Sequence, residues 1–147
     1  MFENFYLNIE LIHTYAKMPT RGTDVSAGLD VYSPFNIDIY SDRDILLPLG
    51  WKCDFSSGYV MIFKDKSGRA TKDKIITHSG VIDSDYRGEV MIHLHNFGNE
   101  TRTIIRGEKI AQFVILPIWL GKPIQVEMVD NNTERGEGGF GSTGIKE

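Results

Sequence analysis

Residues 47–55 read LPLGWKCDF and carry the clearest fold signal in the chain. Every second residue is apolar, beginning with Leu47 and ending with Phe55. Alternation with period two predicts a strand that buries one face and exposes the other. Pro48 cannot donate a backbone hydrogen bond, so it favours an edge position or the start of the strand. The same pattern predicts that Cys53 faces the core.

The rest of the chain carries the same kind of signal. Further strands are predicted at residues 5–11, 59–63, 90–94, 110–116 and 124–128. The second and fourth of these are continuously apolar apart from Gln112, as expected of strands covered on both faces. No window has a sustained helical stripe, although residues 67–74 could hold one helical turn. The sequence therefore predicts an all-β fold, a sandwich or jelly-roll-like β-barrel of many short strands.

Composition limits the function classes that remain. The chain has 147 residues, of which 41% are hydrophobic and 24% charged, as expected of one globular domain. A net charge of -4 argues against broad binding to nucleic acid or to an anionic membrane. Cys53 is the single cysteine, and neither an export signal nor a run of 18 apolar residues is present. We expect a cytoplasmic protein, or one inside the host cell if the source is a virus.

Residues 130–147, DNNTERGEGGFGSTGIKE, differ in kind from the rest. They contain five of the 15 glycines and no strand pattern. We expect a β-domain at residues 1–129 followed by a flexible glycine-rich arm. Glycine backbone N–H groups, the Arg135 guanidinium and neighbouring hydroxyls could bind an anion, and Phe140 could stack on a base. On these residues alone, a simple flexible end is the alternative.

Residues 80–88, GVIDSDYRG, resemble the turn of a β-hairpin. Asp83, beside apolar residues and an aromatic ring, is placed to act as a general base, and the Tyr86 ring could pack against a sugar. A solvated turn is the alternative for this segment alone. Residues 64–69 place three cations around a Ser-Gly turn, which suits phosphate but also suits an ordinary charged loop.

The sequence gives little support for a metal site built by histidines. His93 and His95 would share a strand face, but no third ligand lies nearby in sequence. Surface histidines are the preferred interpretation, and His13 and His78 add nothing to a metal site.

Five short segments follow one another in a specific order. They are AGLDV at 27–31, KSG at 66–68, GVIDSDYRG at 80–88, GEKIAQ at 107–112 and RGEGGFGSTG at 135–144. This set resembles the five ordered motifs of the trimeric dUTPase family. The resemblance implies a jelly-roll homotrimer that hydrolyses dUTP to dUMP and pyrophosphate with Mg²⁺. Such an enzyme limits uracil in DNA and supplies dUMP for thymidylate synthesis.

The resemblance also implies a set of site residues. Asp83 would activate the attacking water, and Asp30, the second residue of the catalytic set, would hold the metal's water shell or order the site. Tyr86 would pack under the deoxyribose. Uracil would be read mainly by the backbone of Thr77, Gly80, Val81, Ile82 and Met91. Phosphates would contact Lys66, Ser67, Gly68, Gln112 and Arg135, while Phe140 would stack on uracil and Gly141, Ser142 and Thr143 would close over the triphosphate.

One motif departs from the family pattern, because Lys66 stands where arginine is usual. A lysine lacks the guanidinium fork, and one hypothesis is that Arg69 compensates. Asp65, expected close to the triphosphate, has no role that the sequence explains. Two alternative functions are a related dCTP deaminase and a nucleotide-responsive binding or signalling protein on the same fold.

Overall fold

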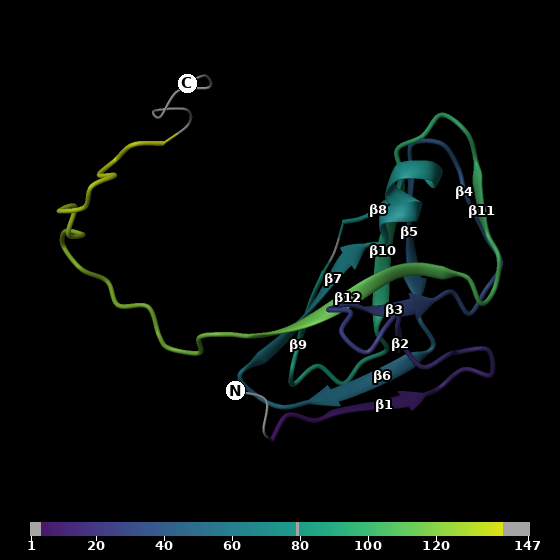
Figure 1. Cartoon of the computed structure of the whole chain (residues 1–147), viewed down its shortest axis with the longest axis horizontal. Coiled ribbons are helices and arrows are strands. Elements are labelled where there is room, and N and C mark those ends of the chain that lie inside the picture. The colour runs from purple at the N-terminus through teal and green to yellow at the C-terminus, as the bar shows by residue number, and fades with distance from the viewer. Residues whose placement is uncertain (1–3, 79, 140–147) are drawn as a thin grey trace.

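The structure is a computed structural model that describes residues 4–78 and 80–139. Within these residues the chain forms short strands and one turn of π-helix (Figure 1). The elements are β1 (Leu7–Leu11), β2 (Thr20–Arg21), β3 (Leu29–Tyr32), β4 (Ile37–Ile39), β5 (Arg43–Pro48), β6 (Trp51–Phe55), β7 (Tyr59–Asp65), η1 (Arg69–Asp73), β8 (Ile75–Thr77), β9 (Val81–Asp83), β10 (Met91–Asn96), β11 (Arg102–Ile104) and β12 (Lys109–Pro117). The described residues contain no helix with the length and apolar character needed to cross a membrane.

The strands pair antiparallel in four sheets. The largest has the order β2-β3-β12-β7-β9, and a second has the order β5-β10-β8. Two further pairs, β1-β6 and β11-β4, complete the described architecture. The sheets enclose one apolar core. In it the ring centroid of Phe113 lies 6.2 Å from that of Trp51 and 5.8 Å from that of Phe63. The all-β prediction is confirmed.

The stretch that predicted the fold forms a corner between two sheets. Its alternating residues are all buried, including Cys53 at 4% exposure. It is two strands rather than one, because the chain turns at Gly50, which has φ +74°. Before the turn β5 pairs with β10, and after it β6 pairs with β1. Pro48 ends an edge strand, so the edge position is confirmed and the strand start is not.

Replacing Gly50 by alanine is expected to destabilise the domain by two separable effects. A Cβ at this position would lie 2.9 Å from the side chains of both Ala16 and His13, in a backbone conformation that favours glycine. Gly58 has φ +84° with nothing within 4 Å, so Gly58→Ala reports the conformational cost alone, about 1–2 kcal/mol. Gly50→Ala adds overlap, and we expect about 1–3 kcal/mol more in urea unfolding. Equal losses in the two variants would contradict this packing.

The other strand predictions divide cleanly. Strands and the helical turn are confirmed at residues 5–11, 59–63, 67–74, 90–94 and 110–116, where β1, β7, η1, β10 and β12 lie. The predicted strand at 124–128 is wrong. That segment has no strand partner within residues 4–78 and 80–139, and Ile124 and Met128 are each 85% exposed. An apolar alternation becomes a strand only when a neighbouring strand accepts its hydrogen bonds.

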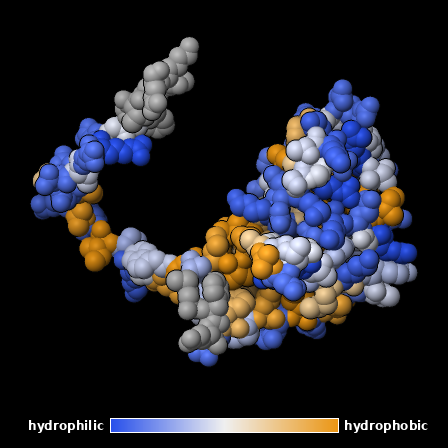
Figure 2. All heavy atoms as spheres, in the orientation of Figure 1, coloured by the Kyte–Doolittle hydropathy of each residue, from blue (hydrophilic) through white to orange (hydrophobic). Residues whose placement is uncertain are grey.

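The chain leaves the core after β12. Ile118 donates its N–H to the carbonyl of Gly58, and the segment then runs away from the domain (Figure 1). Figure 2 shows apolar side chains along this segment, which include Trp119, Leu120, Val126 and Val129, all more than half exposed. Exposed apolar residues gathered in one segment mark a surface that needs a partner.

Candidate active site

Asp30, on β3, lies at the centre of a cluster of charged residues. Its carboxylate is buried and accepts hydrogen bonds from Lys66 Nζ at 3.0 Å and from Lys109 Nζ at 2.7 Å. Burial alone would raise the pKa of Asp30, but the hydrogen bonds from Lys109 and Lys66 outweigh it and hold the pKa below its ordinary value. Asp30 is therefore a permanent anion at neutral pH that fixes the direction of two ammonium groups.

A second set of bonds ties the predicted phosphate segments together. Gln112 donates to the backbone carbonyl of Asp65 at 3.0 Å, and Asp65 accepts the N–H of Thr77 at 2.6 Å. Gly28 makes this possible, because a Cβ there would lie 2.1 Å from Gln112 Oε1. Asp65, which the sequence left unexplained, thus anchors the end of β7 to the start of the next predicted site segment.

The compensation hypothesis for Arg69 is not supported by the geometry. Its guanidinium donates to Asp73, to Glu108 and to the carbonyl of Lys109, so all three nitrogens are engaged. Arg69 instead fixes η1 against the start of β12. Beside η1 lies a shallow hollow of about 420 Å³, lined by Lys66, Gly68, Lys72 and Lys109 together with Arg69 and its two carboxylate partners. Its charge suits phosphate groups.

Residues 80–88 form more than a turn. They lie in the wide loop between β8 and β10, which pair antiparallel, but residues 81–83 form β9 at the edge of the large sheet. Phe63 donates its N–H to the Gly80 carbonyl at 2.7 Å, and Tyr86 donates its N–H to the Asp83 carbonyl at 3.1 Å. The backbone on both sides of the Asp83 side chain is therefore fixed by main-chain bonds.

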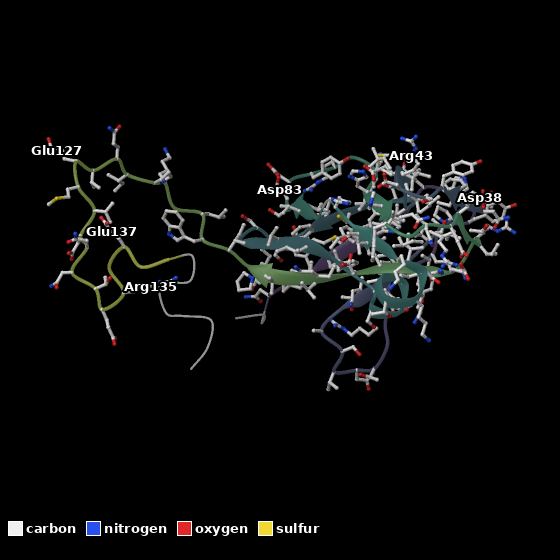
Figure 3. All side chains as sticks on the ribbon, turned by 90° about the horizontal axis from the view of Figure 1, so that it is seen from above. Asp38, Arg43, Asp83, Glu127, Arg135 and Glu137 are labelled. Carbon is white, nitrogen blue, oxygen red and sulfur yellow. The ribbon has the colours of Figure 1, made fainter. Side chains whose placement is uncertain are left out.

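Asp83 itself is exposed at the edge of the domain (Figure 3). It lines a hollow of about 560 Å³ together with Asp85 and Arg87. The Tyr86 ring folds back over Gly88, and its hydroxyl donates to the Glu89 carbonyl at 3.0 Å. Val81, Tyr86 and Met91 remain exposed, at 65%, 42% and 36%. This loop presents the Asp83 carboxylate beside Asp85 and Arg87, and its Val81 and Tyr86 side chains are exposed.

The single chain does not bring its predicted site residues into one place. Asp30 and Asp83 lie on β3 and β9, three strand spacings apart in the same sheet, which is roughly 14 Å. The register adds an offset of four residues along the strands, roughly 13 Å more. Arg135 lies on the extended segment, well away from Asp83, and donates to the Gly138 carbonyl (Figure 3). Phe140, Gly141, Ser142 and Thr143 lie outside the described residues.

One residue of the cluster was missed by the sequence analysis. Lys109 belongs to the GEKIAQ segment but received no role, although its ammonium makes the shorter of the two bonds to Asp30. The pairing of β12 with β3 places it there, opposite Tyr32 and beside Asp30. The contact between Lys109 and Asp30 depends on the register of β12 against β3, and residue spacing in the sequence does not give that register.

The Asp30 cluster predicts a pH-dependent stability difference. Because the pKa of Asp30 is lowered on folding, its contribution is present above the unfolded value and is lost as the pH falls through the folded value. We expect Asp30→Asn to lower the free energy of unfolding by about 1–3 kcal/mol at pH 7. The difference from the parent protein should shrink below about pH 4. Thermal unfolding of both proteins across this range measures it, and a constant difference would contradict the ion-pair account.

These features together define an all-β, jelly-roll-like protein with a basic hollow, an acidic loop and a glycine-rich C-terminal sequence. The dUTPase family profile matches residues 14–144, and the chain belongs to this family.

The similar proteins agree with this assignment. A deoxyuridine 5'-triphosphate nucleotidohydrolase of Nautilia profundicola is 39% identical over 140 residues, covering 94% of this chain and 98% of that protein. The protein of the same name from Rattus norvegicus is 41% identical over 130 residues, and the chain spans 63% of its length. A mutant dUTPase of Staphylococcus bacteriophage 80alpha, solved with dUpNHpp, has a TM-score of 0.88 at 28% identity, covering 95% of this chain and 99% of that one. The predicted jelly-roll-like dUTPase fold is thereby confirmed.

Proposed function

We propose that this protein hydrolyses dUTP to dUMP and pyrophosphate. One observation carries the proposal: segments on which the family resemblance rests contribute charged residues to two hollows, Lys66 and Lys109 to the basic one and Asp83 and Asp85 to the acidic one. A reaction at a triphosphate needs charge neutralisation along the phosphates and a base for the attacking water. The basic hollow would neutralise the phosphate charge, and the acidic hollow would supply the base. In a cell, the reaction would limit uracil in DNA and supply dUMP for thymidylate synthesis.

Asp83 is the proposed general base. Its carboxylate would accept a proton from a water that attacks the α-phosphorus in line with the leaving pyrophosphate. The fixed backbone of β9 and of the following turn supports this role, because it limits where the carboxylate can move. The bond between water oxygen and phosphorus forms as the bond to the bridging oxygen breaks, and pyrophosphate leaves with that oxygen.

The same loop is the proposed base and sugar site. Backbone groups of Thr77, Gly80, Val81, Ile82 and Met91 would read the uracil edge. Cytosine would be rejected, since its amino group would leave buried backbone groups mispaired. Tyr86 would pack under the deoxyribose, where its exposed ring offers an apolar face.

The basic hollow is the proposed phosphate site. Lys66, Ser67, Gly68 and Gln112 would contact the phosphates from one subunit. Arg135, Phe140, Gly141, Ser142 and Thr143 would close over the nucleotide from an arm. Lys66 would approach phosphate as a point charge whose direction is fixed by Asp30.

Magnesium would be held by the substrate more than by the chain. The Asp30 carboxylate already faces two ammonium groups, so its donor chemistry suits contact with a metal-bound water better than direct ligation. Mg²⁺ on the triphosphate oxygens would neutralise charge that develops as pyrophosphate leaves. Asp30 would order the lysines around that charge.

A homotrimer would complete the site. Asp30 and Asp83 are too far apart in one chain to serve one nucleotide, and the segment after β12 extends away with its apolar residues exposed. Docking that segment on a neighbouring subunit would bury Trp119 and Leu120 and carry Arg135 to another subunit's site. Each site would then combine residues from all three chains.

A nucleotide panel tests the function. The protein is incubated with Mg²⁺ and each deoxynucleoside triphosphate in turn, and pyrophosphate and ammonia are both measured. We expect pyrophosphate from dUTP alone and no ammonia. Ammonia from dCTP would identify the deaminase alternative. Nucleotide binding without any product would identify the signalling alternative, and either result would overturn the proposal.

A further inference from the structure

Three histidines and an aspartate gather on the outer face of the β5-β10-β8 sheet. His93 and His95 lie on this face of β10, and Asp44 on β5 is the register partner of His95. His78, just beyond β8, donates its N–H to the carbonyl of His93 at 3.0 Å and so joins the same face. The interpretation that His78 adds nothing is therefore corrected, because strand pairing brings it to residues that are distant in sequence.

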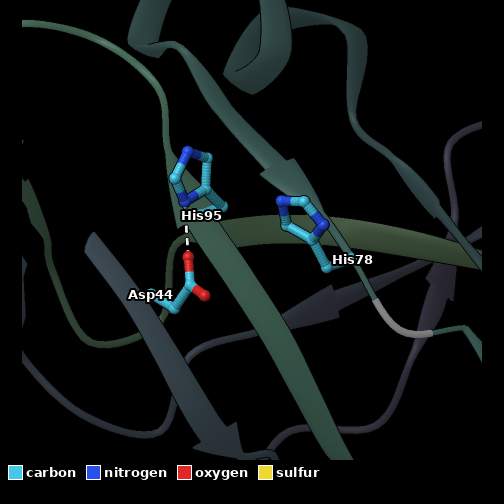
Figure 4. Close-up of side chains that lie close together, drawn as sticks. All are labelled: Asp44, His78 and His95. Carbon is cyan, nitrogen blue, oxygen red and sulfur yellow. Dashed lines mark hydrogen bonds and ion pairs between the residues drawn. The ribbon is translucent and has the colours of Figure 1, made fainter. Parts of the chain in front are cut away.

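Three of these side chains form a tight set. Asp44, His78 and His95 each offer a donor atom, and these atoms all lie within 4.8 Å of one another. The His78 and His95 rings meet edge to face with centroids 5.1 Å apart. Figure 4 shows Asp44 on β5, His95 on β10 and His78 just beyond the end of β8, with the hydrogen bond between Asp44 and His95 Nδ1.

We propose that Asp44, His78 and His95 form a binding site for one divalent transition metal ion of the zinc class. Two imidazoles and a carboxylate are a common protein donor set for Zn²⁺, with water in the fourth position. Mg²⁺ prefers oxygen ligands in an octahedron, so this site differs in kind from the magnesium proposed on the triphosphate.

The required movement is small. Ligand atoms around a tetrahedral zinc lie roughly 3.3 Å apart, which follows from bonds of about 2.0 Å. Asp44 and His78 are exposed, so their side chains can rotate: the hydrogen bond between Asp44 and His95 Nδ1 would open, and the wider gaps within the set would close. His93 Nε2 lies 3.2 Å from Asp44 Oδ2, so His93 is a positioning residue that orients the carboxylate.

The position of the site gives it a consequence for the nucleotide loop. The loop at residues 78–90 follows β8 and precedes β10. The ion would link the ends of these two strands to β5, which pairs with β10. A bound ion would clamp the base of the loop that carries Asp83. This inference does not depend on the proposed hydrolysis, because binding is measured without nucleotide.

The test uses the full chain without a polyhistidine tag. Zn²⁺ is titrated in competition with a chromophoric chelator, in the presence of excess Mg²⁺. We expect one Zn²⁺ per chain with a dissociation constant of roughly micromolar order, and a rise in the midpoint of thermal unfolding. Co²⁺ in place of Zn²⁺ should give the visible absorption of a four-coordinate site.

Variants separate this site from surface binding. His78→Gln and His95→Gln should each weaken Zn²⁺ binding by roughly tenfold or more, and His93→Gln by less. His13→Gln is the matched control, since His13 packs on Phe35 elsewhere in the domain, and it should bind as the parent does. Circular dichroism of the metal-free variants checks that they fold. Binding that Mg²⁺ abolishes, or that His78→Gln and His13→Gln weaken equally, would show an adventitious ion only and overturn the proposal.

Discussion

Replacing Asp83 by asparagine is expected to lower kcat for dUTP hydrolysis by roughly 10²–10⁴-fold. The amide keeps the size of the side chain but cannot accept the proton of the attacking water. KM should change by no more than a few-fold, because the loop is held by backbone bonds of Gly80 and Asp83 that the substitution leaves intact. Steady-state pyrophosphate release and calorimetric binding of dUTP measure the two quantities.

Asp85→Asn is the matched control for this prediction. Asp85 lies two residues away on the same loop and lines the same hollow. The Asp85→Asn substitution removes the same charge as Asp83→Asn, so it reports the general electrostatic effect of losing one carboxylate. Comparable losses in the two variants would show that Asp83 acts through charge alone and would refute its role as the base.

Removing residues 130–147 is expected to lower kcat/KM by about 10²-fold or more. The truncation deletes Arg135 and the glycine-rich motif that would close over the phosphates, and closure both positions substrate and excludes water. The apolar segment at 118–129 stays, so the trimer should persist by light scattering. Activity within a few-fold of the full chain would contradict the proposed role of the arm.

Mixing two inactive variants tests whether sites are shared between subunits. A truncated chain supplies an intact Asp83 loop, and an Asp83→Asn chain supplies an intact arm. After unfolding and joint refolding, some sites receive both intact parts, and activity should return well above the sum of the separate proteins. A mixture no more active than that sum would place the loop and the arm of each site on one chain.

Local pattern predicted the burial in this fold better than its connections. The alternation at residues 47–55 identified five buried side chains correctly, yet it gave no sign that β5 and β6 pair with different strands. The corner depends on the positive φ of Gly50 and on the space beside Ala16, which is set by tertiary packing. The false strand at 124–128 has a related cause, because its apolar residues have no partner strand in the part of the chain that the structure describes.

The candidate site shows the same division. Motif order identified the family, and it identified Asp83, Lys66 and Gly68 among the residues that line the two hollows. The bonds that organise them were not predicted, since Lys109 reaches Asp30 across β3 and β12, and Asp65 reaches Thr77 across β7 and β8. These contacts depend on strand register, which residue spacing does not encode. The cluster at His78 was missed for the same reason.

Hydrolysis of dUTP in water labelled with oxygen-18 tests the central claim most directly. If Asp83 activates a water that attacks the α-phosphorus, mass spectrometry should find one labelled oxygen in dUMP and none in pyrophosphate. Label in pyrophosphate would mean attack at the β-phosphorus. That result, or the absence of any dUMP, would contradict the account.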